Sequence, residues 1–286
     1  MIRQKSFADE DKPALYLVAT PIGNLEELSP RAIHILESVD VVAAEDTRNT
    51  VRLLSHFGIH TRLISHHQHN EQQSAKGLIE LLNQGQSIAV VSDAGYPLIS
   101  DPGSVVAKMV IEAGYSVIPV SGSNAMLNAL VCSGLDTQHF LFYGFLKASE
   151  KERIKELHDL KYYPFTVVFY EAPHRIKKML TSCLEVLGNR NICLARELTK
   201  KHEEFIHGTI EEVLTIVDDL KGEMVVIVEG SKETRDPSED QAAPLVHEQI
   251  NHYIDSGYTT NEAIKKVAKE RGLSKNDLYK EYHGLS

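Results

Sequence analysis

The sequence predicts an α/β protein with two α/β domains and a small helical module at the C-terminal end. Two observations lead to this fold. Short apolar segments alternate with amphipathic segments over residues 13–230, and the chain beyond residue 245 has helical spacing alone. The length of 286 residues exceeds the usual size of one domain. A composition of 42% hydrophobic and 24% charged residues supports packed cores and excludes a disordered or collagen-like chain.

The first domain is expected over residues 13–121, around a mostly parallel, doubly wound sheet. Segments such as IAVV and VVAA are apolar throughout, which is typical of strands covered on both faces. Ser29 and Pro30 suit the N-cap and the first position of a helix. The strands are expected at Leu15–Ala19, Val39–Ala44, Ser87–Val91 and Val117–Val120. The helices are expected at Pro30–Glu37, Thr47–His56, Ser74–Leu82 and Ser104–Glu112.

The second domain is expected over residues 122–230 and is again of the α/β type. Its helices are expected at Asn124–Cys132, Ser149–Leu160, Arg175–Leu187 and Ile210–Leu220. Its strands are expected at Phe165–Tyr170, Ile192–Ala195 and Met224–Glu229.

Residues 231–244 hold almost no large apolar side chain and are interpreted as a linker to a helical module over 245–286. Within the module, TTNEAIKKVAKERGLSKNDLYKEY predicts a helix, a glycine-containing turn and a second helix capped by Ser274. This spacing resembles a helix-turn-helix. It fits a module that faces nucleic acid, and it also fits a packing or dimerisation appendage.

Cysteine usage and the N-terminal residues indicate a cytoplasmic protein. Cys132, Cys183 and Cys193 are too few and too scattered for a disulfide framework or a zinc site, and we interpret them as small apolar residues. The segment MIRQKSFADEDK lacks the apolar part of a signal peptide, and no apolar run approaches a membrane span. We therefore expect a soluble protein in a reducing compartment, with no membrane partner.

Several common signatures are missing from the sequence. It holds no G-x-G-x-x-G, no G-x-x-x-x-G-K-[ST] and no G-x-S-x-G. Dehydrogenases, P-loop NTPases and α/β-hydrolases are therefore not the leading interpretations.

Polar loops follow the expected strands at their carboxyl ends, where open α/β sheets bind ligands. Two glycines, two prolines and two aspartates in residues 92–103 predict a tight turn whose backbone can approach a ligand. Asp93 and Asp101 could bind such a ligand or could cap turns. Further strand-end loops stand at Thr20–Leu25 and Glu45–Arg48, and charged residues follow strands at Glu171–Arg175 and Ala195–Lys200. Helix caps and a Glu–Arg pair are the structural alternative for the last two.

Seven segments together resemble a known family. In chain order, between residues 15 and 230, they are VATPIGNLEELSPRA, AAEDTR, HNEQQ, VSDAGYPLISDPG, FYEAPHR, ARELTK and GEMVVIVEG. They resemble the ribosomal RNA small subunit methyltransferase I family of the tetrapyrrole methylase (class III) superfamily, and the tail resembles that family's helix-turn-helix extension. The resemblance implies two α/β domains with S-adenosylmethionine in the cleft between them, and a homodimer. It also implies 2′-O-methylation of a cytidine in the decoding region of 16S ribosomal RNA, free or in the small subunit.

The resemblance also implies a set of cofactor-binding residues. They are Pro21, Gly23, Asp93, Ala94, Gly95, Tyr96, Ile99, Ala125, Met126, Tyr170, Ala195 and Met224. The sequence departs from the family pattern in two places. Tyr96 stands where the family usually has Thr, and Ser121-Gly122-Ser123 stands where it usually reads P-G-P.

A ribose hydroxyl is a weak acid, so its methylation calls for a general base or a group that orients the lone pair. The carboxylates expected at strand ends are Glu45, Asp46, Glu171 and Glu197. We favour the stretch Glu45–Arg48, with Arg48 contacting an RNA phosphate. Our candidate catalytic residues are Glu45, Asp46, Arg48 and Glu171.

A cluster of histidines lies between two of these loops. His56, His60, His66, His67 and His69 fall within fourteen residues. They lack a clean i, i+4 pair with a third ligand, so no metal site is expected. A loop that faces the substrate is favoured over a solvated surface loop.

The net charge of −10, from 40 acidic and 30 basic residues, argues against indiscriminate nucleic-acid binding. Because steering depends on the local field, we still expect a positive cleft rim and a positive face on the module. A uniformly negative cleft would weigh against RNA. The candidate RNA-binding residues are Arg48, Arg52, Arg175, Arg196, Lys200, Lys265, Lys269 and Lys275. The alternatives are a methyltransferase of small, tetrapyrrole-like molecules and a nucleic-acid-binding regulator with a vestigial cofactor fold.

Overall fold

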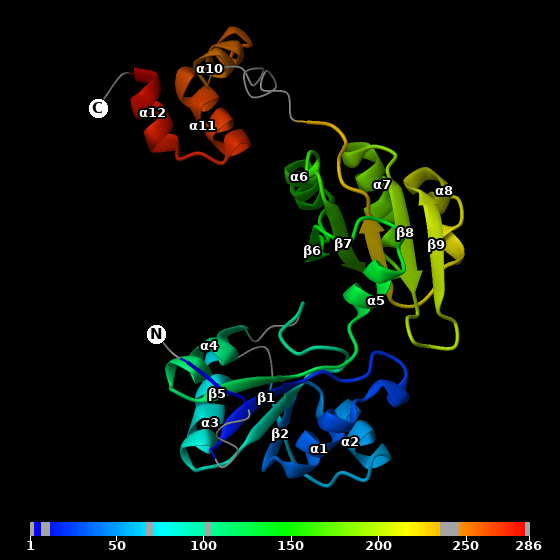
Figure 1. The fold of residues 1–286 in the computed structure, drawn as a ribbon. Helices are drawn as coiled ribbons and strands as arrows, with labels where there is room; N and C mark the ends of the chain where they lie inside the picture. Colours follow the sequence, from blue (N-terminus) through cyan, green and yellow to red (C-terminus); the bar gives the residue numbers. More distant parts are fainter. Residues whose placement is uncertain (1–2, 7–11, 67–70, 101–103, 235–245, 284–286) are drawn as a thin grey trace. The chain divides into compact units, whose positions relative to one another are not determined.

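Two five-stranded sheets make up the larger of the two units into which the chain divides (Figure 1). The computed structural model describes residues 3–6, 12–66, 71–100, 104–234 and 246–283. The larger unit spans residues 1–232, and the smaller unit spans residues 233–286 and is helical. The predicted fold class, α/β with a small helical module, is confirmed.

The first sheet is parallel throughout, as predicted. Its strand order is β3-β2-β4-β1-β5. The strands are β1 (Ala14–Val18), β2 (Val41–Ala44), β3 (Arg62–Ser65), β4 (Ile88–Val91) and β5 (Ser116–Val120). Every residue of β2 and β4 is buried, because helices cover both faces of the sheet.

The side chains of each strand alternate between the two covered faces. Val42 and Val91 face one core, shared with Leu36 of α1, whereas Ile88 faces the other core, shared with Leu78 of α3. The helices are α1 (Pro30–Ser38), α2 (Thr47–His56), α3 (Glu71–Asn83) and α4 (Ser104–Glu112), with a 3-10 turn η1 (Leu25–Glu27) before α1. Helices α1 and α2 cover the first face, and α3 and α4 cover the second.

The neighbouring strands β1 and β4 therefore send their chains to opposite faces, β1 to α1 and β4 to α4. In an open α/β sheet, such a switch point opens a crevice at the carboxyl ends of the strands. Here the two loops are tied together. The backbone N–H of Thr20 donates to the carbonyl of Gly95 at 2.9 Å, and the N–H of Gly95 donates back at 3.0 Å.

The second sheet is mixed rather than parallel. Its order is β6-β7-β10-β8-β9, and only β6 and β7 run parallel. The strands are β6 (Phe140–Phe145), β7 (Thr166–Glu171), β8 (Asn191–Arg196), β9 (Glu204–Thr209) and β10 (Met224–Val228). Strand β10 lies in the middle and all five of its residues are buried.

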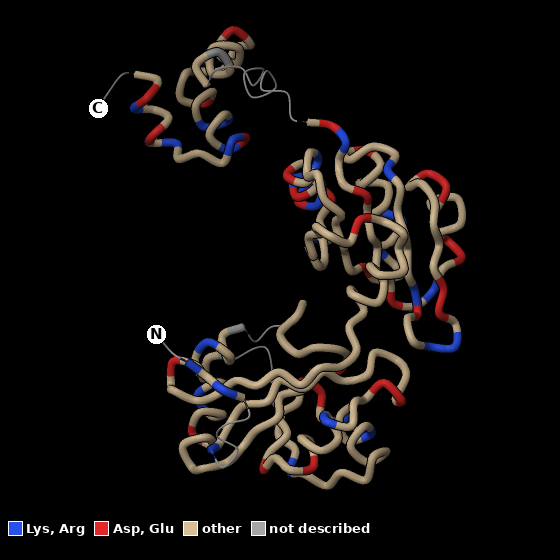
Figure 2. The backbone as a smooth tube through the Cα atoms, in the orientation of Figure 1, with Lys and Arg blue, Asp and Glu red and all other residues tan. Residues whose placement is uncertain are grey.

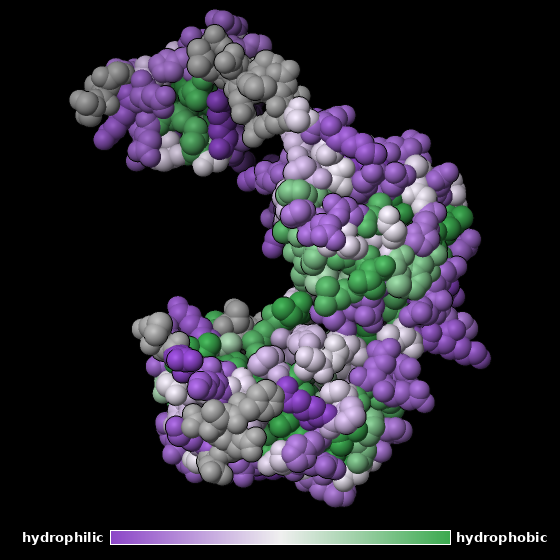
Figure 3. Space-filling model, in the orientation of Figure 1, coloured by the Kyte–Doolittle hydropathy of each residue, from purple (hydrophilic) through white to green (hydrophobic). Residues whose placement is uncertain are grey.

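Helices cover the two faces of the second sheet unequally. On one face α6 (Glu150–Leu160), α7 (Ile176–Leu187), α8 (Ile210–Leu214) and the turn η3 (Val217–Asp219) form the larger core. On the other face lies α5 (Ala125–Val131), packed through Ala129 and Leu130. Helix α5 leaves Leu127 and Val131 exposed, and Figure 3 shows apolar side chains on the surface of this part of the unit.

Strands β3, β6 and β9 were not predicted, and all three lie at sheet edges. An edge strand is only partly covered, so β3 and β9 lack the continuous apolar run that marks a central strand. The expected helix Ile210–Leu220 is also wrong beyond Leu214, where the chain continues into a short 3-10 turn.

Two of the three cysteines pack in the core, as suits small apolar residues. Cys183 and Cys193 are fully buried, and burial raises the pKa of their thiols to about 12 and about 11. Cys132 is exposed at the end of α5, and all three cysteines are free thiols.

The smaller unit holds three helices, α10 (Val246–Asp255), α11 (Thr260–Arg271) and α12 (Lys275–His283). A core including Ile250, Ile264 and Leu278 joins them. The helix, turn and helix predicted from the sequence are present as α11 and α12, with Gly272 in the left-handed region (φ 66°) between them. Across the described ranges, no helix is long and apolar enough to cross a membrane.

Phe169→Ala tests the core of the second sheet. Phe169 is fully buried on β7, so we expect the substitution to lower the free energy of unfolding by about 3–5 kcal/mol. Urea unfolding followed by circular dichroism measures the change. The exposed Ile216→Ala is the control and should cost less than about 0.5 kcal/mol. Equal losses for the two variants would contradict this packing.

Candidate active site

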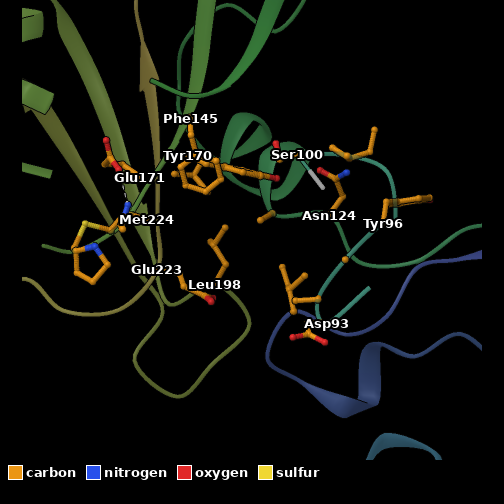
Figure 4. A pocket seen from close by; sticks show the side chains of 18 of the residues that line it. Asp93, Tyr96, Ser100, Asn124, Phe145, Tyr170, Glu171, Leu198, Glu223 and Met224 are labelled. Atoms are coloured by element: carbon orange, nitrogen blue, oxygen red, sulfur yellow. Dashed lines mark hydrogen bonds between the residues drawn. The ribbon is translucent and has the colours of Figure 1, made fainter. Parts of the chain in front are cut away.

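A pocket of about 430 Å³ is formed by loops at the carboxyl ends of the first sheet and by residues of the second sheet (Figure 4). A pocket of this size and largely apolar character suits a small ligand. The lining consists of Ile22, Glu45, Asp93, Ala94, Gly95, Tyr96, Ile99, Ser100, Asn124, Ala125, Phe145, Tyr170, Glu171, Ala172, Pro173, Leu198, Glu223, Met224 and Val225.

One wall is the tight turn after β4. Gly95 has φ 78°, a conformation that glycine adopts without strain, and its backbone pairs with Thr20. Asp93 accepts a hydrogen bond from the Asn49 amide of α2 at 3.1 Å. Leu98 and Ser100 further along also have positive φ, which is costly for residues with a Cβ. The turn is thus held in a strained shape beside the pocket.

The loop after β8 carries the same kind of strain, since Glu197 and Thr199 have φ 50° and 66°. This loop packs against the loop after β1. The backbone N–H of Asn24 donates to Thr199 Oγ1 at 3.1 Å, and a Cβ on Gly23 would lie 2.5 Å from Lys200 Cγ. The glycine at position 23 permits this close approach of the two loops, and its predicted role in cofactor binding stays a prediction.

Tyr170 and Met126 lie together at the start of α5. The backbone N–H of Met126 donates to the Tyr170 hydroxyl at 3.2 Å, and Phe145 packs edge to face on the Tyr170 ring. Tyr170 and Phe145 therefore supply a largely aromatic side of the pocket (Figure 4).

Glu171 is buried at the edge of the pocket, with 1% of its side chain exposed. Its Oε1 accepts from the Ala172 backbone N–H at 2.9 Å and lies 3.1 Å from Arg175 Nε. Its Oε2 is buried and has no hydrogen-bond partner among the described residues. Burial raises the pKa of Glu171, opposed by the Ala172 hydrogen bond and by the charges of Arg175 and Arg153.

Glu45 and Asp46 follow β2 as consecutive residues but have different surroundings. Glu45 lines the pocket. Asp46 is the N-cap of α2 and accepts from the Arg48 backbone N–H at 2.8 Å and from its guanidinium at 2.6 Å. These Arg48 contacts lower the pKa of Asp46 to about 2. Asp46 and Arg48, both predicted to be catalytic, are therefore engaged with each other.

Most of the predicted cofactor residues come together in the pocket. They are Asp93, Ala94, Gly95, Tyr96, Ile99, Ala125, Tyr170 and Met224. Pro21, Gly23, Met126 and Ala195 are not part of the lining. Ala195 is fully buried in the core that the second sheet shares with α5. Sequence reasoning missed the lining residues Ile22, Ser100, Asn124, Phe145, Ala172, Pro173, Leu198, Glu223 and Val225.

Most missed residues adjoin a predicted one in the chain, so a wider window around each motif would have found them. Phe145 lies in an edge strand that was itself not predicted, and no signal singled it out.

The residues that depart from the family pattern make hydrogen bonds at both positions. The Tyr96 hydroxyl accepts from the Gly122 backbone N–H at 3.3 Å, and the Ser123 hydroxyl donates to Glu27 at 2.8 Å. These side chains tie down the turn after β5 without proline.

The charges of the lining differ from the expected positive rim. The charged side chains of the described lining are all carboxylates, Glu45, Asp93, Glu171 and Glu223. Nearby cations are paired with carboxylates. Figure 2 shows that acidic and basic residues are neighbours along the backbone at the β8–β9 loop. The pairs are Arg48–Asp46, Arg175–Glu171, Arg196–Glu204, Lys200–Glu197 and Lys200–Glu223. The expectation of a positive rim is wrong for this lining, which repels phosphate and attracts a cation. By the criterion stated above, this negative lining weighs against RNA phosphates inside the pocket.

The histidine cluster is only partly described. His67, His69 and the loop residue Asp101 lie outside the described residues. His66 Nδ1 makes a short hydrogen bond with Ser74 Oγ of α3, and His56 packs on Phe57. No metal-binding group of His, Cys, Asp or Glu occurs among the residues that were placed. The predicted role of this cluster in facing the substrate stays a prediction.

Comparison with known proteins finds a matching family model and similar full-length proteins. The family model described as Tetrapyrrole (Corrin/Porphyrin) Methylases matches residues 14–214. A Bacillus subtilis (strain 168) protein named Ribosomal RNA small subunit methyltransferase I is 48% identical and covers 98% of both chains. A protein of the same name from Escherichia coli O157:H7 is 42% identical over 98% of both chains.

Solved structures share the fold. The uroporphyrin-III C-methyl transferase from Thermus thermophilus, complexed with S-adenyl homocysteine, superposes with a TM-score of 0.55 at 18% identity. The match covers 76% of this chain and 97% of that one.

Arg48→Ala tests the pairing that engages Asp46. The pKa of Asp46 should rise from about 2 toward its ordinary value of 3.8, as measured by NMR titration of the carboxyl carbon. Because the folded pKa is the lower one, the stability that Asp46 contributes is present above pH 3.8 and is lost as the pH falls through about 2. Arg52→Ala, on the same helix, should leave this pKa unchanged. An unchanged pKa in Arg48→Ala would show that the pair does not hold in solution.

Proposed function

The chain belongs to the tetrapyrrole (corrin/porphyrin) methylase family, and we propose that it transfers a methyl group from S-adenosylmethionine to the 2′-hydroxyl of a cytidine in 16S ribosomal RNA. The observation that carries the proposal is the sequence similarity, 42–48% identity over nearly the whole length, to proteins named Ribosomal RNA small subunit methyltransferase I. The carboxylates of the pocket lining also suit a cationic cofactor.

The residues of the pocket fit S-adenosylmethionine. When bound, this cofactor supplies an electrophilic methyl group on a sulfonium cation. The carboxylates of Glu45 and Asp93 stabilise positive charge at the first-sheet side of the pocket. Because Gly95 has no side chain, polar groups of the cofactor can approach the backbone of this turn closely. Tyr170, Leu198 and Met224 provide apolar surface for an adenine ring.

Glu45 is the carboxylate best placed to accept the proton of the ribose hydroxyl. It lines the pocket at the carboxyl end of β2, whereas its neighbour Asp46 is held by Arg48 at a pKa of about 2. A group with so low a pKa is a poor proton acceptor at neutral pH. The remaining task of the pocket is to align the hydroxyl oxygen with the methyl carbon, since the displacement is in line.

The phosphates of an RNA substrate are better held outside the pocket. Lys265, Lys269 and Lys275 are exposed on the helical unit, and Arg52 is exposed on α2. Only the target nucleoside needs to enter the acidic lining, which restricts binding to a structured target. Arg175, Arg196 and Lys200 are engaged in ion pairs, so we assign the RNA contacts mainly to the first four.

Two alternatives differ from this proposal in what they bind. A methyltransferase of tetrapyrrole-like molecules would bind S-adenosylmethionine but would not methylate ribosomal subunits. A regulator with a vestigial pocket would fail to bind S-adenosylmethionine. The expected homodimer and the cytoplasmic location stay predictions.

Ribose-methylation mapping of small-subunit RNA tests the function directly. A strain that lacks this gene should lose one 2′-O-methylcytidine in the decoding region, and the gene supplied on a plasmid should restore it. An unchanged map would rule out the proposed substrate.

Glu45→Gln should lower the single-turnover rate of methyl transfer by about 10²- to 10⁴-fold, because the amide cannot accept the proton. Rapid-quench assays with radiolabelled S-adenosylmethionine measure this rate. Asp46→Asn is the matched control, since asparagine also caps a helix, and its rate should stay within a few-fold of the wild type. If Glu45→Gln retained the wild-type rate, Glu45 would not be the proton acceptor.

The triple variant Lys265→Ala, Lys269→Ala and Lys275→Ala tests the RNA contacts. If each lysine contacts a phosphate, the salt dependence of RNA binding should weaken by about 2 in the slope of log affinity against log salt. Filter binding of small-subunit RNA between low and moderate salt gives this slope. A control triple of Lys147, Lys151 and Lys155 removes the same charge from another exposed surface and should change the slope little. Equal changes in both triples would indicate a general charge effect.

A further inference from the structure

Phe145 stands at the opening of the pocket. Its side chain is 49% exposed, whereas Leu198 and Met224 of the same lining are 6% and 2% exposed. Tyr96 and Tyr170, the other aromatic residues of the described lining, are less exposed than Phe145. A ligand that enters the pocket from solvent therefore meets the ring of Phe145 before it meets the buried apolar residues.

The ring of Phe145 offers a flat apolar surface to such a ligand. It packs edge to face with Tyr170, with 5.7 Å between the ring centroids, beside which it lies in Figure 4. This contact covers at most one of the two faces of the Phe145 ring, in keeping with its exposure. Phenylalanine has no polar group, so the surface suits a planar ring and makes no hydrogen bond to it.

A β-bulge in β6 turns Phe145 toward this side of the second sheet. The register with β7 shifts between Phe142 and Gly144. In a regular strand, position 144 would share the face of Phe142, because side chains alternate. Here Phe145 takes that position, and Phe142 and Phe145 both pack on Tyr170. Gly144 has φ 79°, which glycine adopts without strain, and bulges of this kind re-aim side chains beside active sites.

The strained turn after β4 reaches the same place. A Cβ on Gly144 would lie 3.3 Å from Ser100 Oγ, so the turn and the end of β6 lie side by side. Ser100 has φ 59°, a costly conformation for a residue with a Cβ, and its neighbour Ile99 lines the pocket as an exposed apolar side chain. An interrupted strand ladder and a strained turn thus meet at the opening, which is typical of a place that binds a ligand.

The base of the target nucleotide is the occupant that this position favours. The proposed function gives the buried apolar residues Leu198 and Met224 to the adenine of the cofactor, whereas the target nucleoside enters from an RNA that stays outside. Its base therefore comes to lie at the opening, beside Phe145. A base drawn out of an RNA strand loses its stacking neighbours, and aromatic side chains take their place in protein–RNA complexes.

We propose that the ring of Phe145 stacks on the cytosine base of the target nucleotide and holds it at the opening of the pocket while the ribose is methylated. The inference rests on the proposed function. Stacking engages the base and leaves the 2′-hydroxyl available to Glu45, so Phe145 binds the substrate and takes no part in proton transfer. Because the ring makes no hydrogen bond, it holds the base without reading its identity.

An RNA without the target base gives the test. The substrate that the wild type methylates, free small-subunit RNA or the assembled subunit, is prepared with either cytidine or an abasic ribonucleotide at the acceptor position. Binding of both forms is measured in the presence of S-adenosylhomocysteine. The wild type should bind the cytidine form about tenfold more tightly or better, and Phe145→Leu should reduce this ratio by about fivefold or more. Leucine keeps an apolar side chain and removes the flat ring.

Two further variants separate stacking from a structural effect. Phe145→Tyr keeps the ring and should keep the wild-type ratio. Phe140→Leu is the matched control, since Phe140 lies on the same strand β6, is 38% exposed and is not part of the lining. It should also keep the wild-type ratio. With the cytidine substrate, Phe145→Leu should raise the half-saturating concentration and leave the maximal single-turnover rate within a few-fold of the wild type.

An equal ratio in the wild type and in Phe145→Leu would overturn the inference, and methylation by the wild type would leave the proposed function intact. If Phe145→Leu instead weakened binding of S-adenosylhomocysteine, measured by isothermal titration calorimetry, and left the RNA ratio unchanged, the ring would serve the cofactor and the inference would again be overturned. Failure of the wild type to methylate either substrate would overturn both the proposed function and this inference.

Discussion

The pair of backbone hydrogen bonds between Thr20 and Gly95 is the constraint on which the site depends. It joins the loops after β1 and β4 where the first sheet sends its chains to opposite faces. The pairing needs the positive φ of Gly95 and a Thr20 hydroxyl that donates to the Ser92 carbonyl at 3.1 Å. With the turn fixed, Asp93 and Tyr96 take their places in the pocket, and the strain at Leu98 and Ser100 is held by the surrounding structure.

Charge is distributed so that the pocket and the rest of the surface favour different ligands. Carboxylates line the pocket, and the nearby cations are bound to other carboxylates, as Lys200 is to Glu197 and Glu223. This arrangement suits a sulfonium and discourages phosphate from entering. An acidic protein can still act on RNA if exposed lysines on a separate unit contact the backbone while one nucleoside reaches the pocket.

Much of the fold and part of the site could be predicted from the sequence. The central strands β2 and β4 are apolar throughout, so their burial and their order along the chain could be predicted, and the motif loops that follow them gave Glu45 and Asp93 as site residues. Tyr170, on β7, came from the family resemblance. Edge strands such as β9 were missed, because half-exposed residues carry a weak pattern. Phe145 was missed with its edge strand.

The sequence by itself determined which segments are strands with both faces covered, where glycine-rich turns end them, and to which family the motifs belong. Burial, turn chemistry and capping depend on residues close together in the chain, so they are visible without the fold. Only the tertiary structure decided the roles of similar residues. It placed Glu45 in the pocket and Asp46 on Arg48, brought Gly23 against Lys200, and left one oxygen of Glu171 without a donor among the described residues. The approach of Gly23 to Lys200 and the pocket around Glu45 join residues distant in the chain, which no local pattern encodes. The Asp46–Arg48 pair is local, but the start of α2 decides which of the two neighbouring carboxylates it engages.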